Sequence, residues 1–393
     1  MGLLLALGVG IPCLLLAQQP PAGAHNAGKA PGKAAGQAPA STVEAIPRSA
    51  CTPAPLPRRA AAVLIVGLPG VLRGDQPLAR AVIDLGVSGI FLGHDNVQSA
   101  TQVRELVAEL RRRAGRPLLV STDEESGRVA VTGPLLGYGP SPRRLARQNT
   151  PQQVRAYAGG LGKGLRDLGI NLDLAPVADL DAGPAGGVIG DRSFAATPTT
   201  AEAYSRAFAE GLADSGVTPT VKHFPGQGRS AGDTHARRVV VRAALGDLQV
   251  TDLSPFQRLI DAGAPVVMLN HLDYTALDPD LPASLSPAAY GLLRTMGFRG
   301  VAMTDSLGMG AVNLRWDFPE AAVRAIAAGA DAAFATDGKQ AARMRDALVA
   351  AVRTGRLPQS RLDEAAARVT ALAGGDPQAL TCTTAQRVSF PAG

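Results

Sequence analysis

Residues 265–271 (PVVMLNH) show the pattern that decides the fold, a short continuous apolar run that ends in polar side chains. An apolar run of this length without alternation is typical of a strand buried on both faces of a parallel sheet. Seven more runs of this kind occur, at residues 61–66 (AAVLIV), 87–92 (VSGIFL), 117–121 (PLLVS), 170–175 (INLDLA), 217–221 (VTPTV), 300–303 (GVAM) and 330–335 (ADAAFA). Longer amphipathic stretches that read as helices separate most of the runs, for example residues 151–168, 201–215 and 320–328.

Eight strand–helix units predict an α/β protein with a single (β/α)8 TIM-like barrel, which we expect over residues 51–385. The alternative is a doubly wound open sheet. Such sheets usually carry a GxGxxG turn after the first strand, and residues 67–70 (GLPG) do not match it.

The composition excludes several classes of protein. With 46% hydrophobic residues and 3 Cys among 393, the chain is neither disordered nor a disulfide-dense miniprotein. Only residues 2–17 form a long apolar run without charge, which argues against a polytopic membrane protein. The net charge is +6, but there is no run of five basic residues and the aromatic fraction is 4%, so no nucleic-acid partner is expected. A mildly basic surface suits an anionic cell envelope.

Three consecutive cations, Arg111-Arg112-Arg113, follow an amphipathic stretch that includes Val103. The spacing predicts that they form the solvated end of a helix, where the helix dipole favours positive charge.

The first fifty residues read as an export signal and a linker. Residues 2–17 (GLLLALGVGIPCLLLA) are apolar and Ala22-Gly23-Ala24 offers a cleavage site, so residues 1–24 are predicted to be an export signal. No Lys or Arg precedes the apolar run, which leaves a weak signal or a mis-assigned start open. A permanent membrane anchor and lipidation at Cys13 are the alternatives, both disfavoured by the sequence context. Residues 25–50, rich in Ala, Pro and Gly, predict a flexible linker.

Export predicts an extracellular or cell-envelope protein with no stable membrane span after the signal is removed. Two cysteines, Cys51 and Cys382, then remain at the two edges of the folded region. An oxidising compartment allows a disulfide between them, and two free thiols are the alternative.

Polar side chains follow the ends of the predicted strands. They are Gly93-His94, Asp123-Glu124, Asp179, Lys222-His223, Asn270-His271, Asp305 and Asp337. Because the C-terminal ends of all barrel strands face one mouth, we expect these residues to meet there.

Two segments carry the chemistry at this mouth. Residues 222–235 (KHFPGQGRSAGDTH) form a polar loop in which Asp233 lies two positions from His235. A carboxylate beside an imidazole fixes the imidazole tautomer and suits it to proton transfer, although the pair could also be an ordinary surface pair. In residues 301–311 (VAMTDSLGMGA), Asp305 leaves a strand end and could be a base, a nucleophile or a metal ligand. No His-x-His cluster is present, so neither a metal nor another cofactor is expected.

These two segments closely resemble the signature segments of glycoside hydrolase family 3, in its single-barrel β-N-acetylglucosaminidase branch. Further similarity lies in residues 170–180 (INLDLAPVADL), 188–194 (VIGDRSF), 268–286 (MLNHLDYTALDPDLPASLS) and 321–331 (AAVRAIAAGAD). The resemblance implies a retaining, two-step hydrolysis. In it Asp305 is the nucleophile that forms a covalent glycosyl-enzyme, and His235, oriented by Asp233, is first the acid and then the base.

The resemblance also implies a substrate site and a substrate. Asp123, Arg192, Lys222 and His223 would hold the sugar, with Asp179 in support. The substrate would be a glycan with terminal β-N-acetylglucosamine, from cell wall or chitin, bound by a monomer. A β-glucosidase on the same barrel and a glycan-binding barrel without activity are the alternatives.

The chain departs from the family pattern D-x-E-G-G-x-V-x-R after the third strand. Ser126 stands where Gly is expected, and Val131 stands where the sugar-binding Arg is expected. Arg128 lies three residues before that position and is expected to point elsewhere. Gln227 replaces a His in the segment KHFPGQG. These departures leave the preferred sugar open.

Overall fold

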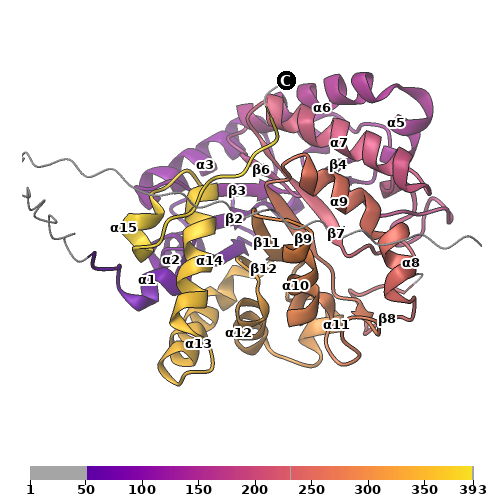
Figure 1. Ribbon diagram of the computed structural model, residues 1–393. Helices are drawn as coiled ribbons and strands as arrows, with labels where there is room; N and C mark the ends of the chain where they lie inside the picture. Colours follow the sequence, from indigo (N-terminus) through magenta and orange to yellow (C-terminus); the bar gives the residue numbers. More distant parts are fainter. Residues whose placement is uncertain (1–50, 231, 392–393) are drawn as a thin grey trace, which may run out of the picture. The chain divides into compact units, whose positions relative to one another are not determined.

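The computed structural model describes residues 51–230 and 232–391, in which eight parallel strands form a barrel surrounded by helices (Figure 1). The strands are β1 (Leu64–Gly67), β2 (Gly89–Phe91), β3 (Leu119–Thr122), β6 (Leu172–Asp173), β7 (Thr218–Phe224), β9 (Val266–Leu269), β11 (Val301–Thr304) and β12 (Ala333–Ala335). They pair in the order β11-β9-β7-β6-β3-β2-β1-β12. A bridge from Met303 to Ala332, the residue before β12, joins the two edge strands. Each strand overlaps one of the eight predicted runs, so the predicted barrel is confirmed.

The helices alternate with these strands. They are α1 (Leu56–Ala61), α2 (Pro77–Leu85), α3 (Ala100–Ala114), α4 (Gly133–Leu136), α5 (Pro142–Gln148), α6 (Pro151–Asp167), α7 (Pro198–Asp214), α8 (Leu245–Val250), α9 (Leu253–Asp261), α10 (Pro287–Thr295), α11 (Gly310–Asn313), α12 (Phe318–Ala328), α13 (Ala341–Arg353), α14 (Gln359–Leu372) and α15 (Pro377–Thr381). Short strands β4 (Glu124–Ser126), β5 (Val129–Ala130), β8 (Val240–Val241) and β10 (Asp273–Tyr274) lie in the loops after the barrel strands. The predicted export signal (residues 1–24), the linker (25–50) and Cys13 lie outside the described residues.

Apolar side chains fill the interior of the barrel, so it is a core and not a pore. Phe91 and Phe334 meet there edge to face, with ring centroids 5.3 Å apart. Leu174 and Met268 lie in the same cluster, and Leu372 at the end of α14 joins it. This filling separates the two ends of the barrel.

The prediction for the three cations at the end of α3 is correct for two of them. Arg112 and Arg113 are exposed, and Arg113 pairs with Asp84 on α2. Arg111 is only partly exposed, because it turns under the barrel and donates from Nη2 to the carbonyl of Gly169, 2.8 Å away. The expectation of a solvated Arg111 is therefore wrong.

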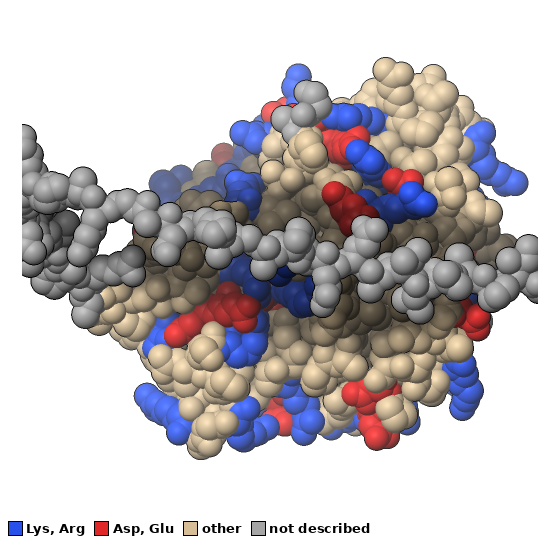
Figure 2. Space-filling view, viewed as in Figure 1, with Lys and Arg blue, Asp and Glu red and all other residues tan. Residues whose placement is uncertain are grey.

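A disulfide joins Cys51 to Cys382 and ties the first described residue to the end of α15, as the sequence allowed. Within residues 51–230 and 232–391, none of the helices has the length and apolar character needed to cross a lipid bilayer. Basic and acidic side chains are interspersed over the face seen in Figure 2, in keeping with 39 basic and 33 acidic residues.

Candidate active site

A cavity of about 450 Å³ lies at the C-terminal ends of the barrel strands. All seven residues predicted to act on a glycan line it: Asp123, Arg192, Lys222, His223, Asp233, His235 and Asp305. Leu174, Met268 and Phe334 from the barrel core also line it and give it an apolar floor. The structure therefore brings together residues that lie far apart in the sequence.

Not every polar residue at a strand end reaches this cavity. His94 is exposed outside it, and Asp337 accepts a backbone hydrogen bond from Lys339 in a separate turn. Asn270 is buried and donates to the carbonyl of His223 at 3.0 Å. The expectation that all strand-end residues meet at the mouth is wrong for these three and also for Gly93, Glu124, Asp179 and His271, none of which lines the cavity. The polar side chains among them make turns or hydrogen bonds within the protein instead.

Asp305 follows β11 and faces the cavity as a carboxylate. Its Oδ1 accepts the backbone N–H of Ser306 at 2.7 Å. Burial acts to raise the pKa of Asp305, but His271 and His223 in their protonated forms, the Ser306 N–H and the charge of Lys222 outweigh it, and the net pKa is lowered. The group is therefore ionised at neutral pH.

His271 contacts the residue after Asp305 and does not line the cavity. Its Nδ1 lies 2.6 Å from the Ser284 hydroxyl and its Nε2 lies 2.9 Å from the Ser306 carbonyl. Because a carbonyl only accepts, Nε2 donates and Nδ1 accepts the hydroxyl proton. Burial lowers the pKa of His271, so this neutral tautomer is favoured and holds the turn that carries Asp305.

Lys222, at the end of β7, is the centre of a buried ion cluster. Its Nζ lies 2.6 Å from Asp123 Oδ1 and 2.6 Å from Glu125 Oε1. Arg192 grips Glu125 through two N–H···O contacts of 2.7 Å each. Burial alone would raise the pKa of Glu125, but Arg192 and Lys222 outweigh it and hold that pKa well below its ordinary value. The four charges are thus fixed in place before any ligand binds.

Glu125 is the main residue of this site that the sequence reasoning missed. It is two positions from Asp123, and residues two apart on an extended segment point to the same side. Glu124 points to the other side, where its Oε2 accepts from the backbone N–H of Thr132 at 2.8 Å. The alternating direction of side chains along residues 123–125 (DEE) is the sequence signal that indicates Glu125 as a site residue.

His223 is held in one tautomer by a buried carboxylate. Its Nδ1 lies 2.6 Å from Asp179 Oδ2, and Asp179 Oδ1 accepts the backbone N–H of Gln227 at 2.7 Å. With Nδ1 donating, Nε2 is an acceptor and lies 3.3 Å from Arg192 Nη2. The register of β7 against β9 shifts between Lys222 and Phe224, and this irregularity lets two consecutive side chains reach the cavity.

The Asp233–His235 pair lies on the loop after β7. Asp233 Oδ1 accepts the backbone N–H of His235 at 2.9 Å and lies 2.8 Å from its Nδ1. The backbone and side-chain hydrogen bonds from His235 lower the pKa of Asp233. The His235 side chain is 73% exposed, so its Nε2 is free to exchange a proton with a ligand.

The segment that carries His235 is fixed to the segment that follows Asp305. Gly310 N donates to the His235 carbonyl at 2.8 Å, and Ala311 N donates to the Thr234 carbonyl at 3.0 Å. A Cβ on Gly310 would lie 2.7 Å from the His235 oxygen, so glycine is needed for this approach. The two catalytic candidates are therefore linked through backbone hydrogen bonds.

The departures from the family pattern have structural consequences. Ser126 has φ 70°, a backbone conformation that suits glycine, and its Oγ makes two contacts of 2.7 Å, to the Pro140 carbonyl and the Tyr157 hydroxyl. Val131 is 4% exposed and lies outside the cavity lining. Gln227 lines the cavity.

Arg128 was expected to point away from the site, and this expectation is wrong. Arg128 lines the cavity, where its Nη2 donates to the Gly187 carbonyl at 2.6 Å and the Ile189 carbonyl at 2.8 Å. Its Nε lies 3.0 Å from Asp191. The hairpin of β4 and β5 turns this side chain back over the mouth, which residue spacing alone does not show. In the described chain, no group of three His, Cys, Asp or Glu side chains is arranged to hold a metal ion.

Comparison with known proteins identifies the family of the chain. The family model described as "Glycosyl hydrolase family 3 N terminal domain" matches residues 63–372. Beta-hexosaminidase LpqI of Mycobacterium tuberculosis is 40% identical over 359 residues, which are 87% of this chain and 90% of LpqI.

Solved structures agree as well. A structure of M. tuberculosis LpqI has a TM-score of 0.76 at 42% identity and covers 82% of this chain and 94% of its own. A beta-N-acetylhexosaminidase from Beutenbergia cavernae has a TM-score of 0.74 at 30% identity and covers 82% and 99%. With a match to the family over most of its length, the chain belongs to glycoside hydrolase family 3 and is a glycoside hydrolase.

Proposed function

We propose that the chain is an exported, retaining β-N-acetylhexosaminidase that removes terminal β-N-acetylglucosamine from cell-wall or chitin-derived glycans. The observation that carries the proposal is that Asp305 and the Asp233–His235 pair line one cavity. The names of the relatives, a beta-hexosaminidase and a beta-N-acetylhexosaminidase, support the choice of sugar.

In the first step, Asp305 attacks the anomeric carbon of the sugar. The bond from that carbon to the leaving oxygen breaks, and the proton on His235 Nε2 moves to this oxygen. The products are a glycosyl ester on Asp305, a free alcohol and a neutral imidazole. The lowered pKa of Asp305 keeps the nucleophile ionised for this step.

In the second step, the neutral His235 takes a proton from water as the water attacks the anomeric carbon. The ester bond to Asp305 breaks and the carboxylate is regenerated, so two inversions give net retention. Asp233 holds Nδ1 of the ring at 2.8 Å and stabilises the imidazolium. An imidazole in this role adds no second fixed negative charge beside the nucleophile.

The ion cluster around Lys222 would hold the sugar. The side chain of Asp123 is 28% exposed, whereas that of Glu125 is 1% exposed. We therefore assign Asp123, with Lys222, Arg192 and His223, to contacts with sugar hydroxyls, and we assign Glu125 to holding Lys222 and Arg192. Such preorganised donors and acceptors suit an uncharged, hydroxyl-rich ligand.

Export is supported by the disulfide between Cys51 and Cys382, because disulfides persist in oxidising compartments. It also fits the predicted signal at residues 1–24.

The test of the mechanism is turnover of 4-nitrophenyl β-N-acetylglucosaminide by the full chain. We expect Asp305→Asn to lower kcat by at least about a thousandfold, since the covalent step is lost. Asp75 is an exposed aspartate that does not line the cavity, so Asp75→Asn is the matched control and should keep parental activity. An Asp305→Asn variant as active as the parent would refute the mechanism.

A β-glucosidase is the second candidate, because Val131 removes a cationic donor that the family pattern places near the sugar. The ratio of kcat/KM for the β-N-acetylglucosaminide and the β-glucoside decides between them. We expect the N-acetylated substrate to be preferred, and a preference for glucose would select the second candidate. Tight glycan binding without turnover of either substrate would instead indicate a binding protein.

A further inference from the structure

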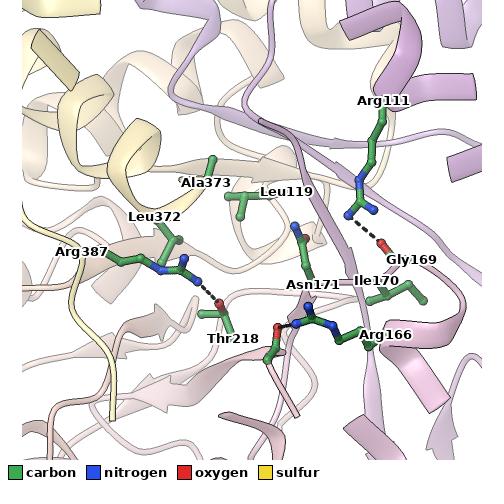
Figure 3. A pocket seen from close by; sticks show the side chains of 11 residues that line it. Arg111, Leu119, Arg166, Gly169, Ile170, Asn171, Thr218, Leu372, Ala373 and Arg387 are labelled. Carbon is green, nitrogen blue, oxygen red and sulfur yellow. Dashed lines mark hydrogen bonds between the residues drawn. The ribbon is translucent and has the colours of Figure 1, made fainter. Parts of the chain in front are cut away.

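A second cavity of about 450 Å³ lies at the opposite end of the barrel, where β3, β6 and β7 begin (Figure 3). Its lining includes three arginines from three separate parts of the chain. They are Arg111 at the end of α3, Arg166 at the end of α6 and Arg387 in the segment after α15. The barrel core separates this cavity from the active site.

Each of the three guanidinium groups is held in place by one contact with the barrel end. Arg111 donates to the Gly169 carbonyl at 2.8 Å, and Arg166 donates to the Gly216 carbonyl at 3.2 Å. Arg387 donates to the Thr218 hydroxyl at 3.4 Å. A guanidinium has five N–H donors, so most of the donors in this cavity remain available to a ligand.

The described lining of this cavity contains no carboxylate. Within residues 51–230 and 232–391, none of its three arginines takes part in an ion pair. Burial lowers the pKa of Arg111, and the positive charge of Arg166 lowers it further. Arg111 and Arg166 therefore repel one another, and no carboxylate in the described lining compensates their charge.

A second group of three arginines shows how this chain neutralises such a cluster elsewhere. Arg294, Arg361 and Arg368 surround the buried carboxylate of Asp331, with N···O distances of 2.5, 2.7 and 3.0 Å. Asp331 is 0% exposed, and its pKa is lowered although its burial acts to raise it. The cavity at the N-terminal end of the barrel also has three arginines, but its described lining has no carboxylate among them.

We propose that this cavity is an oxyanion site that binds the phosphate group of a phosphate ester or of inorganic phosphate. Guanidinium forks match phosphate oxygens, and three of them around one cavity suit a tetrahedral group with more than one negative charge. The volume exceeds that of the phosphate group alone, which leaves room for an ester substituent. Because the site lies at the other end of the barrel, its ligand does not compete with the glycan.

The experiment measures the Tm of the full chain in sodium chloride and in phosphate at equal ionic strength. At about 10 mM phosphate we expect the parent Tm to rise by roughly 2 °C, the shift for a ligand at about ten times its dissociation constant. Arg387→Gln and Arg111→Gln should lose most of this shift. Arg112→Gln, the exposed neighbour on α3, changes the net charge equally and should keep it.

The Arg387→Gln variant keeps the test decisive, because this side chain is exposed and makes one long contact. It should keep parental hydrolase activity, which separates this site from the active site. No shift in the parent, or an equal shift in the parent and Arg387→Gln, would overturn the proposal.

Two further arms identify the source of the phosphate. Sedimentation with phosphatidylglycerol vesicles but not with phosphatidylcholine vesicles, lost in Arg387→Gln, assigns a lipid headgroup. A Tm shift with glycerol phosphate and no vesicle binding assigns a soluble phosphate ester. Either result, together with the loss in Arg387→Gln, supports the site.

Discussion

At the C-terminal end of the barrel, Lys222 and Arg192 each contact a carboxylate within 2.7 Å, whereas at the N-terminal end Arg111, Arg166 and Arg387 contact none in the described chain. The two cavities have the same volume and are separated by the same apolar core. The difference lies in where the compensating charge comes from. The C-terminal end of the barrel (the upper end) supplies its own anions. At the N-terminal end (the lower end), the anion has to come from a ligand.

This difference matches the ligands that we propose. A neutral sugar needs donors and acceptors that are fixed in advance, and paired charges provide both without a net field. A phosphate group brings its own charge, so unpaired arginines are the better partner. The comparison predicts that changes at one end leave the function of the other end intact.

Beyond the loss of the nucleophile in Asp305→Asn, the largest effect is expected from His235→Ala. Loss of the proton donor should lower kcat by about a hundred- to ten-thousandfold on a substrate with a poor leaving group. A substrate with an acidic phenol as leaving group should lose less in the first step, because it needs no protonation. His94→Ala, an exposed histidine outside the cavity, is the control. Equal losses on both substrates would contradict the assignment of His235 as the acid.

Glu125→Gln would remove a carboxylate partner from Arg192 and Lys222, so the cations at the upper end would lose part of their compensating charge, as those at the lower end lack it in the described chain. The mostly buried Arg192 would lose the charged bidentate partner that the buried Glu125 provides, and the free energy of unfolding should fall by about 3 kcal/mol, as for other broken buried pairs. Urea unfolding measures this change, with Glu105→Gln on the exposed face of α3 as control. A change no larger than that of the control would show that the cluster does not depend on Glu125.

Glu124 is a buried carboxylate with no cation beside it in the described chain, and its titration gives a further prediction. Burial raises the pKa of Glu124 to about 7, so the folded protein holds this proton more tightly than the unfolded chain, whose glutamates have their ordinary value of 4.5. The stability contributed by the proton is present at low pH and is lost as the pH rises from about 4.5 to about 7.

Glu124→Gln keeps an acceptor for Thr132 and removes this titration. The variant should gain about 2 kcal/mol relative to the parent when the pH is raised from about 5 to about 8. Tm measured against pH for both proteins checks this, and parallel curves would contradict it.

The smallest effect is expected from Arg387→Glu, which gives the lower end a carboxylate of its own. It should raise the free energy of unfolding by at most about 1 kcal/mol at low salt, because an exposed ion pair is weak. It should also abolish the Tm shift with phosphate. A lower stability at low salt than that of Arg387→Gln would mean that the remaining arginines do not gain a partner.

Most of the fold could be predicted from the sequence, because strands buried on both faces leave continuous apolar runs. All eight predicted runs overlap a barrel strand, and α6 begins at Pro151 as expected. The positions of Asp305 and His235 at one mouth also follow from the barrel, since strand ends converge there.

The predictions that were wrong or absent concern the direction in which a side chain points. Glu124 and Glu125 are adjacent, and only the pleat of β4 decides which one meets Lys222. The hairpin of β4 and β5 directs Arg128 into the cavity, where it donates to the Gly187 carbonyl. Arg111 points to the N-terminal end of the barrel, where it donates to the Gly169 carbonyl. The lower cavity could not be predicted, because its arginines come from α3, α6 and the segment after α15 and share no motif.

The central claim is tested most directly by trapping the covalent intermediate with a fluorinated N-acetylglucosamine-type glycoside whose second step is slow, followed by peptide mass mapping. The account predicts a single sugar adduct on the peptide that contains Asp305, formed faster by the parent than by His235→Ala. An adduct on the peptide that contains Asp123 and Glu125, or continued hydrolysis with no adduct, would contradict it.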